Sequence, residues 1–412
     1  FKDGLSRRLD ENLKHWHDWL AVSEDRIHAM PENVQKMVRK SLMTIKAHTD
    51  VRGGIIASCD SSIYNYGRDY YSYVWPRDGA YAVWPLIRLG YTEEAKAFFK
   101  FCADIITPDG YLMHKYQPDR AIGSTWHPLL HNNVKELAIQ EDETATVLIM
   151  MGEYLDYSGD EHFVQEMFDR FILKAADFMC AFIDEKTSLP HASYDLWEEK
   201  FLTSTYTAAT TYRALLVAGD IAEKFGAKNS AEKWRGTARD LLNNADIFIN
   251  PETGCYRKGY LLSPDDGNLQ FDDVLDVSSF YGVMMFDYAH DSSSGIVSTV
   301  KAIEQKLIGE APTGGSPRYE YDNYFKISPD SKPNPWLITT LWMAQFYVRI
   351  GNTEKAAEIL KWVESKALPS GVLPEQIHSE NGSPISVTPL VWSHAEYINT
   401  ALDLAQKNHN HS

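Results

Sequence analysis

The sequence predicts an all-α fold, a closed ring of six helical hairpins that forms an (α/α)6 barrel. Helical periodicity dominates the 412 residues, and strand signals are sparse. Helix–turn–helix pairs recur about every 60 to 70 residues, the signature of a repeated supersecondary unit. An open superhelix of such pairs is the alternative architecture. It would not need the long connecting segments, rich in Trp, Tyr and carboxylates, that separate the pairs here.

Each predicted hairpin consists of an apolar-periodic helix, a short turn and an amphipathic helix. The turns supply Gly to end one helix and Thr, Ser, Asn or Asp to cap the next. Five pairs follow this pattern: 80–89 with 93–106, 144–157 with 161–183, 207–225 with 228–242, 277–288 with 294–307, and 337–350 with 353–363.

A sixth pair joins the two ends of the predicted barrel. Helical stretches at 32–43 and 392–406 supply its two members. We therefore expect an N-terminal linker or helix over residues 1–30 and a single catalytic domain over 31–412. Five long segments between helices are expected to line a funnel at one end of this domain, because such loops are usually functional: 108–143, 184–206, 247–272, 308–336 and 367–391.

Composition narrows the class of ligand. The net charge of −17 repels phosphate backbones and anionic lipid surfaces, so we expect no nucleic-acid or membrane partner. A neutral sugar would feel little of this charge. The 23 Tyr, 17 Phe and 11 Trp suit a pocket that combines flat apolar rings with hydrogen-bonding groups. The four cysteines have no metal-ligand spacing, and nothing calls for a metal or an organic cofactor.

Location and oligomeric state stay open. No apolar run reaches the roughly 18 residues that span a membrane, and no secretory leader is visible, which favours the cytoplasm. The chain begins with Phe rather than Met, so we expect that its N-terminus is incomplete.

The strongest local motif is the segment Tyr194-Asp195-Leu196-Trp197-Glu198-Glu199. Two adjacent carboxylates repel each other and rarely stand in an aromatic segment without a role. A carboxyl group beside an apolar ring has a raised pKa, the property that a general acid needs near neutral pH. A surface acidic pair with Trp197 packed inward is the alternative.

Glu375 lies in the segment Leu373-Pro374-Glu375-Gln376. It is a candidate catalytic residue only because it can pair with Glu198. Cleavage of a glycosidic bond needs two carboxyl groups on opposite faces of that bond. A barrel can bring together residues that are far apart in sequence. If one of the two is the base, it should stay ionised, so its surroundings should be more polar than those of the acid.

The segment from Tyr71 to Gly79 offers a sugar-binding surface. Arg77 and Asp78 present donors and acceptors that fork onto neighbouring hydroxyls, and Trp75 supplies a ring for stacking. An Arg–Asp pair at the N-terminus of a helix that opens at Ala80 is the alternative.

These motifs resemble those of glycoside hydrolase family 15, which includes glucoamylases, glucodextranases and some trehalases. The similar segments appear in the family's order between about residues 40 and 400: YSYVWPRDGAY (71–81), SYDLWEEK (193–200), PRYEYDNY (317–324), NPWLITTLW (334–342), LPEQ (373–376) and VWSHAEY (391–397).

The resemblance implies an (α/α)6 barrel that removes glucose from α-glucosides with inversion at the anomeric carbon. It implies that Glu198 is the general acid and Glu375 the general base. Eight further positions match substrate-binding residues of the family: Tyr71, Trp75, Arg77, Asp78, Trp126, Trp197, Glu199 and Arg318. The surroundings of Trp126, GSTWHPLLHNN, depart from the usual pattern. The stretch IQEDETATVL (139–148) resembles the bacterial and archaeal branch, in which a β-sandwich usually precedes the barrel.

Several alternatives remain. Asp272, Asp273 and Asp276 fit a DDxxD pattern that would place three carboxylates on one helical turn for Mg²⁺ and a pyrophosphate. His127 and His131 have the i, i+4 spacing of a zinc pair, although Pro128 intervenes. A sugar-binding barrel without activity is the non-enzyme alternative. The linkage, whether α-1,4, α-1,6 or α,α-1,1, is undecided.

Overall fold

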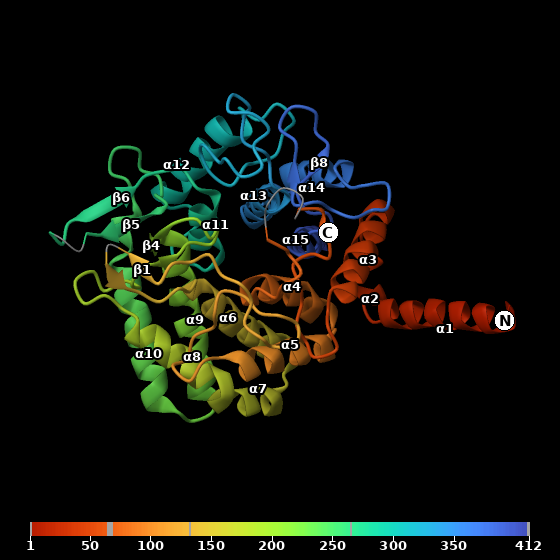
Figure 1. Cartoon of the computed structure of the whole chain (residues 1–412), viewed down its shortest axis with the longest axis horizontal. Helices are drawn as coiled ribbons and strands as arrows, with labels where there is room; N and C mark the ends of the chain where they lie inside the picture. The colour runs from red at the N-terminus through yellow and green to blue at the C-terminus, as the bar shows by residue number, and fades with distance from the viewer. Residues whose placement is uncertain (1, 64–68, 132, 264–265, 410–412) are drawn as a thin grey trace.

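The chain forms the predicted (α/α)6 barrel. The computed structural model describes residues 2–63, 69–131, 133–263 and 266–409. Six inner helices contact one another in sequence, and the last contacts the first, which closes the ring (Figure 1). They are α4 (Pro76–Leu89), α6 (Glu141–Ser158), α9 (Thr205–Lys224), α11 (Val277–Met285), α13 (Leu337–Arg349) and α15 (Val391–His409).

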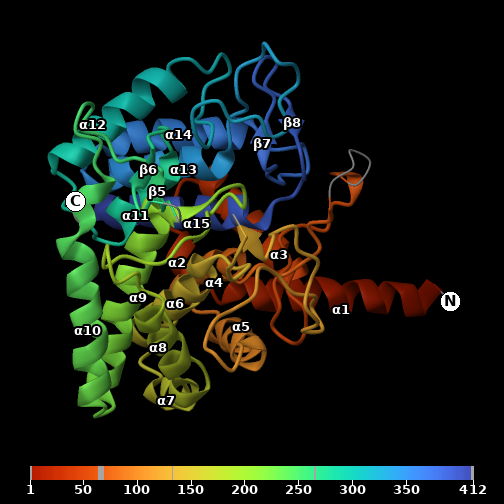
Figure 2. The same ribbon diagram turned by 60° about the vertical axis from the view of Figure 1, so that its left-hand side comes forward.

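The second member of each hairpin lies outside the ring (Figures 1 and 2). The predicted pair from the two chain ends is confirmed, because α3 packs on α15. The outer layer comprises α3 (Glu32–Ala47), α5 (Thr92–Ile105), α7 (Glu161–Met167) with α8 (Leu173–Ala181), α10 (Lys228–Asn243), α12 (Ser294–Ala302) and α14 (Thr353–Ser365). Short π-helical turns, Phe168–Ile172 and Ile303–Ile308, follow α7 and α12.

Two helix starts differ from the sequence prediction by three residues or more. Helix α4 begins at Pro76 rather than Ala80, since Pro is favoured in the first turn. Asp78 lies inside that first turn and makes no capping hydrogen bond, but it does form the pair with Arg77 at the helix N-terminus that was the alternative to a sugar-binding role. Helix α6 begins at Glu141 rather than Thr144, and its first turn carries Glu141, Asp142 and Glu143, all fully buried.

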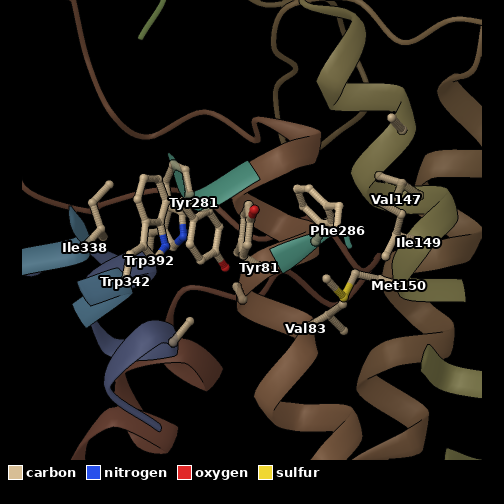
Figure 3. Packing of buried hydrophobic residues seen from close by; sticks show 14 of the residues in the cluster. Tyr81, Val83, Val147, Ile149, Met150, Tyr281, Phe286, Ile338, Trp342 and Trp392 are labelled. Carbon is tan, nitrogen blue, oxygen red and sulfur yellow. The ribbon is translucent and has the colours of Figure 1, made fainter. Parts of the chain in front are cut away.

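Aromatic rings carried by α4, α11, α13 and α15 pack together inside the barrel (Figure 3). Tyr281 stacks on Trp342 with ring centroids 4.1 Å apart, and Tyr81 stacks on Trp392 at 4.8 Å. Each ring buries a large apolar area, and stacked pairs add attraction beyond burial. These contacts close the centre of the ring.

The predicted loops contain short antiparallel strands that the sequence analysis missed. β3 (Ser193–Tyr194), β4 (Phe201–Ser204), β5 (Gly259–Leu262) and β6 (Leu269–Asp272) form one sheet in sequential order. β1 (Leu130–His131) pairs with β2 (Val134–Lys135), and β7 (Gln376–Ile377) with β8 (Pro384–Ile385). Two of these hairpins hold the segments that carry Glu198 and Glu375.

The N-terminal helix α1 (Lys2–Ala21) projects from the body (Figure 1). Its C-terminal end is attached: Trp19 stacks against Tyr91 at 4.3 Å and donates a hydrogen bond to Glu94 at 2.7 Å. The short helix α2 (Glu24–Ile27) follows, and Ile27 joins the core. Within the described residues, we find no helix with the length and hydropathy to cross a membrane.

Candidate active site

One pocket gathers all ten residues that were predicted to be catalytic or substrate-binding. Its volume is about 380 Å³, within the range of small-molecule sites. It lies at the N-terminal ends of inner helices, since its lining includes the first turns of α4, α13 and α15. The ten residues are Tyr71, Trp75, Arg77, Asp78, Trp126, Trp197, Glu198, Glu199, Arg318 and Glu375.

The segment 195–200, which we call the acid loop, joins β3 to β4. Asp195 organises it: its Oδ1 accepts the backbone N–H groups of Glu199 at 2.8 Å and Lys200 at 3.0 Å. The backbone N–H of Glu198 donates to the carbonyl of Asp195 at 2.8 Å. This tight turn places Glu198 at φ 63°, a left-handed conformation that costs free energy for a side chain other than Gly.

A buried cation fastens the acid loop to helix α11. Lys258 Nζ lies 2.6 Å from Asp195 and 3.2 Å from Asp276, and all three side chains are almost fully buried. Burial raises the pKa of Asp195, but the charge and hydrogen bond of Lys258 together with the backbone hydrogen bonds from the acid loop outweigh it, so the net pKa is lowered. Trp197 Nε1 donates to Asp276 at 3.0 Å.

The predicted pyrophosphate-type carboxylate cluster is wrong. Asp272 ends β6 and pairs with Lys200, whereas Asp273 lies 3.1 Å from Arg257. Asp276 instead accepts the backbone N–H of Ser278 at 2.8 Å and caps helix α11. The three carboxylates therefore lie on a strand end, a loop and a helix cap, and do not share one helical turn.

The carboxyl group of Glu198 lies beside His114 and Arg77. Its Oε2 lies 2.9 Å from His114 Nε2, and its Oε1 lies 3.8 Å from Arg77. Burial raises the pKa of Glu198, but the His114 ring and Arg77 outweigh this and lower it to about 2. The expectation that an apolar ring raises this pKa is therefore wrong for the free pocket.

Glu375 is 2% exposed and lies just before strand β7. Its Oε2 accepts hydrogen bonds from the Ser386 hydroxyl and, at 3.0 Å, from Gln376. Burial raises the pKa of Glu375, and these hydrogen bonds offset the rise only in part. The expected order of polarity is thus reversed, since the pKa of Glu375 is raised and that of Glu198 is lowered.

Helix α15 fixes the segment that carries Glu375. The backbone N–H of Leu373 donates to His394 Nε2 at 2.9 Å, and the Ser393 hydroxyl donates to the carbonyl of Pro374 at 2.9 Å. His394 Nδ1 lies 2.8 Å from the Ser41 hydroxyl of α3. Burial lowers the pKa of His394 to about 3, so the ring is neutral. Nδ1 then carries the hydrogen, because Nε2 accepts.

Arg77 stands among carboxylates at the base of the pocket. It is 3% exposed and lies 3.2 Å from Asp78, 3.2 Å from Asp142 and 3.7 Å from Glu143. Its backbone N–H also donates to Glu143 at 2.7 Å. Burial raises the pKa of Asp78 to about 6, although the charge of Arg77 opposes this.

The remaining predicted residues form the pocket walls. Arg318 pairs with Glu199 at 2.7 Å and with Asp322 at 2.7 Å, and its guanidinium lies 4.6 Å from the centre of the Trp336 ring. Trp126 is half exposed, and its Nε1 donates to the carbonyl of Glu198 at 3.4 Å.

Sequence reasoning missed His114, Lys258 and Asp276 as parts of the site. His114 and Lys258 stand in no motif that marks a role, because their partners come from other loops. Asp276 was considered only as part of the DDxxD pattern. Asp142 and Glu143 were noted only for their resemblance to the family. A run of three acidic residues at the start of an apolar helix was the available signal, since such a run needs a buried cation.

The predicted zinc pair does not share a helix. His131 belongs to β1 and stacks on Phe201 at 3.8 Å, whereas His127 is sandwiched between Tyr194 at 3.8 Å and His114 at 4.0 Å. His114, His127 and Glu198 place ligand-type atoms within 4.8 Å of one another. The two imidazoles are stacked, however, so a cation at about 2.0–2.1 Å from both would lie far out of each ring plane.

Known proteins support the same assignment of fold. Among solved structures, a bacterial glucoamylase complexed with acarbose superposes with a TM-score of 0.76 at 21% identity, covering 92% of this chain and 57% of that one. The glucoamylase from Saccharomycopsis fibuligera superposes with a TM-score of 0.70 at 17% identity, covering 91% of this chain and 95% of that one.

Curated relatives carry hydrolase names. An uncharacterized glycosyl hydrolase of Methanocaldococcus jannaschii is 27% identical over 380 residues, 89% of this chain and 55% of its own length. Trehalase 2 of Sulfolobus acidocaldarius is 23% identical over 375 residues, 85% of this chain and 60% of its own length. This chain thus spans little more than half the length of these relatives. The profile described as Glycosyl hydrolases family 15 matches residues 32–402, and the chain belongs to that family.

Proposed function

We propose that this chain is the catalytic part of an inverting, exo-acting α-glucosidase that releases β-glucose from the non-reducing ends of α-glucosides. The observation that carries the proposal is one pocket that holds Glu198 and Glu375 together with Arg77 and Asp78. Trp392 lines this pocket and stacks on the fully buried Tyr81, which closes the base. A pocket that is closed at one end accommodates the end of a sugar chain better than its middle.

In this proposal Glu198 gives a proton to the glycosidic oxygen while the bond from that oxygen to C1 breaks. Glu375 takes a proton from the water that attacks C1 from the opposite face. Asp78 and Arg77 hold hydroxyls of the terminal sugar. Tyr71, Trp75 and Trp197 offer rings to its apolar faces. In the same proposal, Trp126, Glu199 and Arg318, which also line the pocket, contact the leaving sugar.

The ionisation of Glu375 sets one limit on activity. A general base must be ionised, and burial raises the pKa of Glu375 above its ordinary range. The acidic limb of the pH–rate profile should therefore lie above pH 4.5, the ordinary pKa of a glutamate side chain.

Trehalose is the second candidate substrate. The observation that favours it is the name trehalase on several relatives, among them those of Mycobacterium tuberculosis, at 22% identity, and Sulfolobus acidocaldarius. The same pocket and the same two carboxyl groups would serve an α,α-1,1 bond.

Proton NMR of fresh product tests both candidates. The protein is mixed with maltose, isomaltose, maltotriose or trehalose without added metal. Inversion gives early β-glucose from the non-reducing end of the first three, and equal α- and β-glucose from trehalose. Glu198→Gln and Glu375→Gln should each lower kcat by about 10²- to 10⁴-fold.

Two outcomes would contradict this proposal. Early α-glucose alone from trehalose, or from the non-reducing end of maltotriose, would indicate a covalent intermediate and sink inversion. Absence of cleavage in all four sugars would point first to another sugar or linkage, and then to a sugar-binding barrel without activity.

A further inference from the structure

His114 makes the closest contact to the proposed acid. It is 2% exposed and lies in the connection between α5 and α6. Its Nε2 lies 2.9 Å from Glu198 Oε2, and its Nδ1 lies 3.0 Å from the hydroxyl of Thr125. Both nitrogens are satisfied in either protonation state. A protonated ring donates twice, whereas a neutral ring donates from Nδ1 and accepts at Nε2 from a protonated Glu198.

Neighbouring rings hold His114 in this orientation. Its ring stacks on His127 at 4.0 Å with an angle of 21° between the planes. The rings of Trp126 and Trp75 pack edge-on against it, with centroids 4.9 Å and 6.2 Å away. Burial lowers the pKa of His127 to about 3, so this neighbour stays neutral. Packed rings fix one rotamer, and the hydrogen bond to Glu198 is therefore maintained.

We propose that His114 is a positioning residue that holds the catalytic proton jointly with Glu198. This inference rests on the proposed function, because it assigns the source of the proton that Glu198 donates. In the free pocket the proton lies on His114 Nε2, and Glu198 is the ionised partner. When a sugar displaces water from the pocket, the proton moves to Glu198, since a neutral pair suits the drier site better than two charges.

The proton then passes from Glu198 to the glycosidic oxygen as the C1–O bond breaks. Glu198 is left as a carboxylate beside a neutral His114, and Glu375 holds the proton from the attacking water. Release of product lets solvent return one proton to the His114–Glu198 pair and remove one from Glu375. The sequence consumes one water and changes no redox state.

The surroundings of the pair decide how removal of His114 should act. The other titratable or charged groups around it are Arg77, Asp78, Asp195, His127, Tyr71 and Lys115. Without the imidazole, only the carboxyl group of Glu198 can hold the catalytic proton. A carboxyl group loses its proton at a lower pH than an imidazole does. The basic limb of the pH–rate profile should therefore move to lower pH.

His114→Gln tests this, because glutamine can still donate to Glu198 but holds no titratable proton. With the best glucoside substrate, we expect the basic limb to fall by at least about one pH unit and kcat at pH 7 to fall about 10- to 100-fold. With α-glucosyl fluoride, whose leaving group departs as an anion, kcat should fall less than about threefold. His131→Gln is the matched control, since it changes the same residue type in the same connection without touching Glu198. An unchanged basic limb, or an equal loss with both substrates, would overturn the proposal.

A second measurement does not depend on activity. In protein labelled with nitrogen-15 at histidine, the His114 ring signals are followed by NMR against pH in wild type and in Glu198→Gln. We expect the His114 ring to lose its proton at a pH at least about one unit lower in Glu198→Gln, while the His131 signals stay unchanged. Identical His114 titrations would overturn the shared proton even in an active enzyme. The expected shift in a protein that cleaves none of the sugars would leave the pair standing and reject only the proposed function.

Discussion

At the scale of single residues, the base of the pocket sets Arg77 against several carboxylates. Arg77 is held by Asp142 and Glu143 of α6, so it is pinned before any ligand arrives. Asp78 points from the first turn of α4 into the pocket, where burial raises its pKa to about 6. A sugar-binding carboxylate with this pKa is ionised at neutral pH and neutral in mild acid.

Affinity for the terminal sugar should therefore depend on pH through Asp78. An ionised carboxylate accepts hydroxyl hydrogen bonds more strongly than a neutral carboxyl group does. Glucose binding to the Glu375→Gln variant, measured by calorimetry, should weaken about threefold to tenfold between pH 7.5 and pH 5. Asp78→Asn should bind weakly and with little pH dependence in the same background. Equal pH dependence in both proteins would assign the effect to another group.

At the scale of elements, the acid loop adopts an unfavourable backbone conformation at Glu198, and this conformation directs the Glu198 side chain into the pocket. Six residues turn between β3 and β4, and this turn holds Glu198 in the left-handed region. Lys258 and Asp276 hold the loop through Asp195 and Trp197. His114 contacts the Glu198 side chain.

The left-handed conformation should be measurable as a difference between two inactive variants. Glu198→Gly and Glu198→Ala both remove the carboxyl group, but only glycine adopts φ 63° without strain. We expect Glu198→Gly to be more stable than Glu198→Ala by about 1 kcal/mol in urea unfolding. Equal or reversed stabilities would mean that the loop relaxes when the carboxyl group is lost.

The link between α15 and the Glu375 segment predicts a pH dependence of stability. The pKa of His394 is about 3 in the folded protein and close to 6.5 in the unfolded chain. The unfolded state therefore binds one more proton between these values, so the stability that neutral His394 confers is lost as the pH falls from about 6.5 towards 3.

His394→Gln should remove this contribution, because the amide can accept from Leu373 and donate to Ser41 without titrating. Its unfolding free energy should fall less steeply than that of wild type between about pH 6.5 and 4.5, by up to about 1.4 kcal/mol per pH unit. Urea unfolding at several pH values measures the two slopes. Parallel curves would contradict the assignment.

At the scale of the whole molecule, the first part of helix α1 lies apart from the barrel (Figure 1). Residues 6–15 are exposed, and the ion pairs of this part, Arg7–Glu11 and Lys14–Asp18, lie within the helix itself. Attachment to the body begins further along, at Trp19.

Removal of residues 1–14 should leave the barrel intact. We expect the thermal unfolding midpoint to change by less than about 1 °C, because exposed positions away from the body contribute little. Trp19→Ala in the full chain is the contrasting variant and should cost about 1–2 kcal/mol, since it removes a stacked ring and a hydrogen bond to Glu94. A large loss on truncation would show that α1 takes part in folding.

The sequence by itself predicted the helical hairpins, their closure into a ring and ten of the residues that line the pocket. Periodicity and capping are local, so hairpin boundaries such as those at Gly90 and Asn352 follow from neighbours in the chain. Ordered motifs far apart, such as those of Glu198 and Glu375, were enough to expect one shared site.

Only the tertiary structure decided the ionisation of that site. The pKa of a carboxyl group depends on burial and on charges within a few ångströms, and these come from other loops. His114 is 84 positions from Glu198 along the chain, yet it lowers the pKa of Glu198 more than Arg77 or His127 does. For the same reason, the sequence did not predict that Lys258 pairs with Asp195 of the acid loop. Nor did it predict that Asp272 and Asp273 pair with different cations, Lys200 and Arg257. Sequence neighbours predict the backbone, but electrostatics is set by neighbours in space.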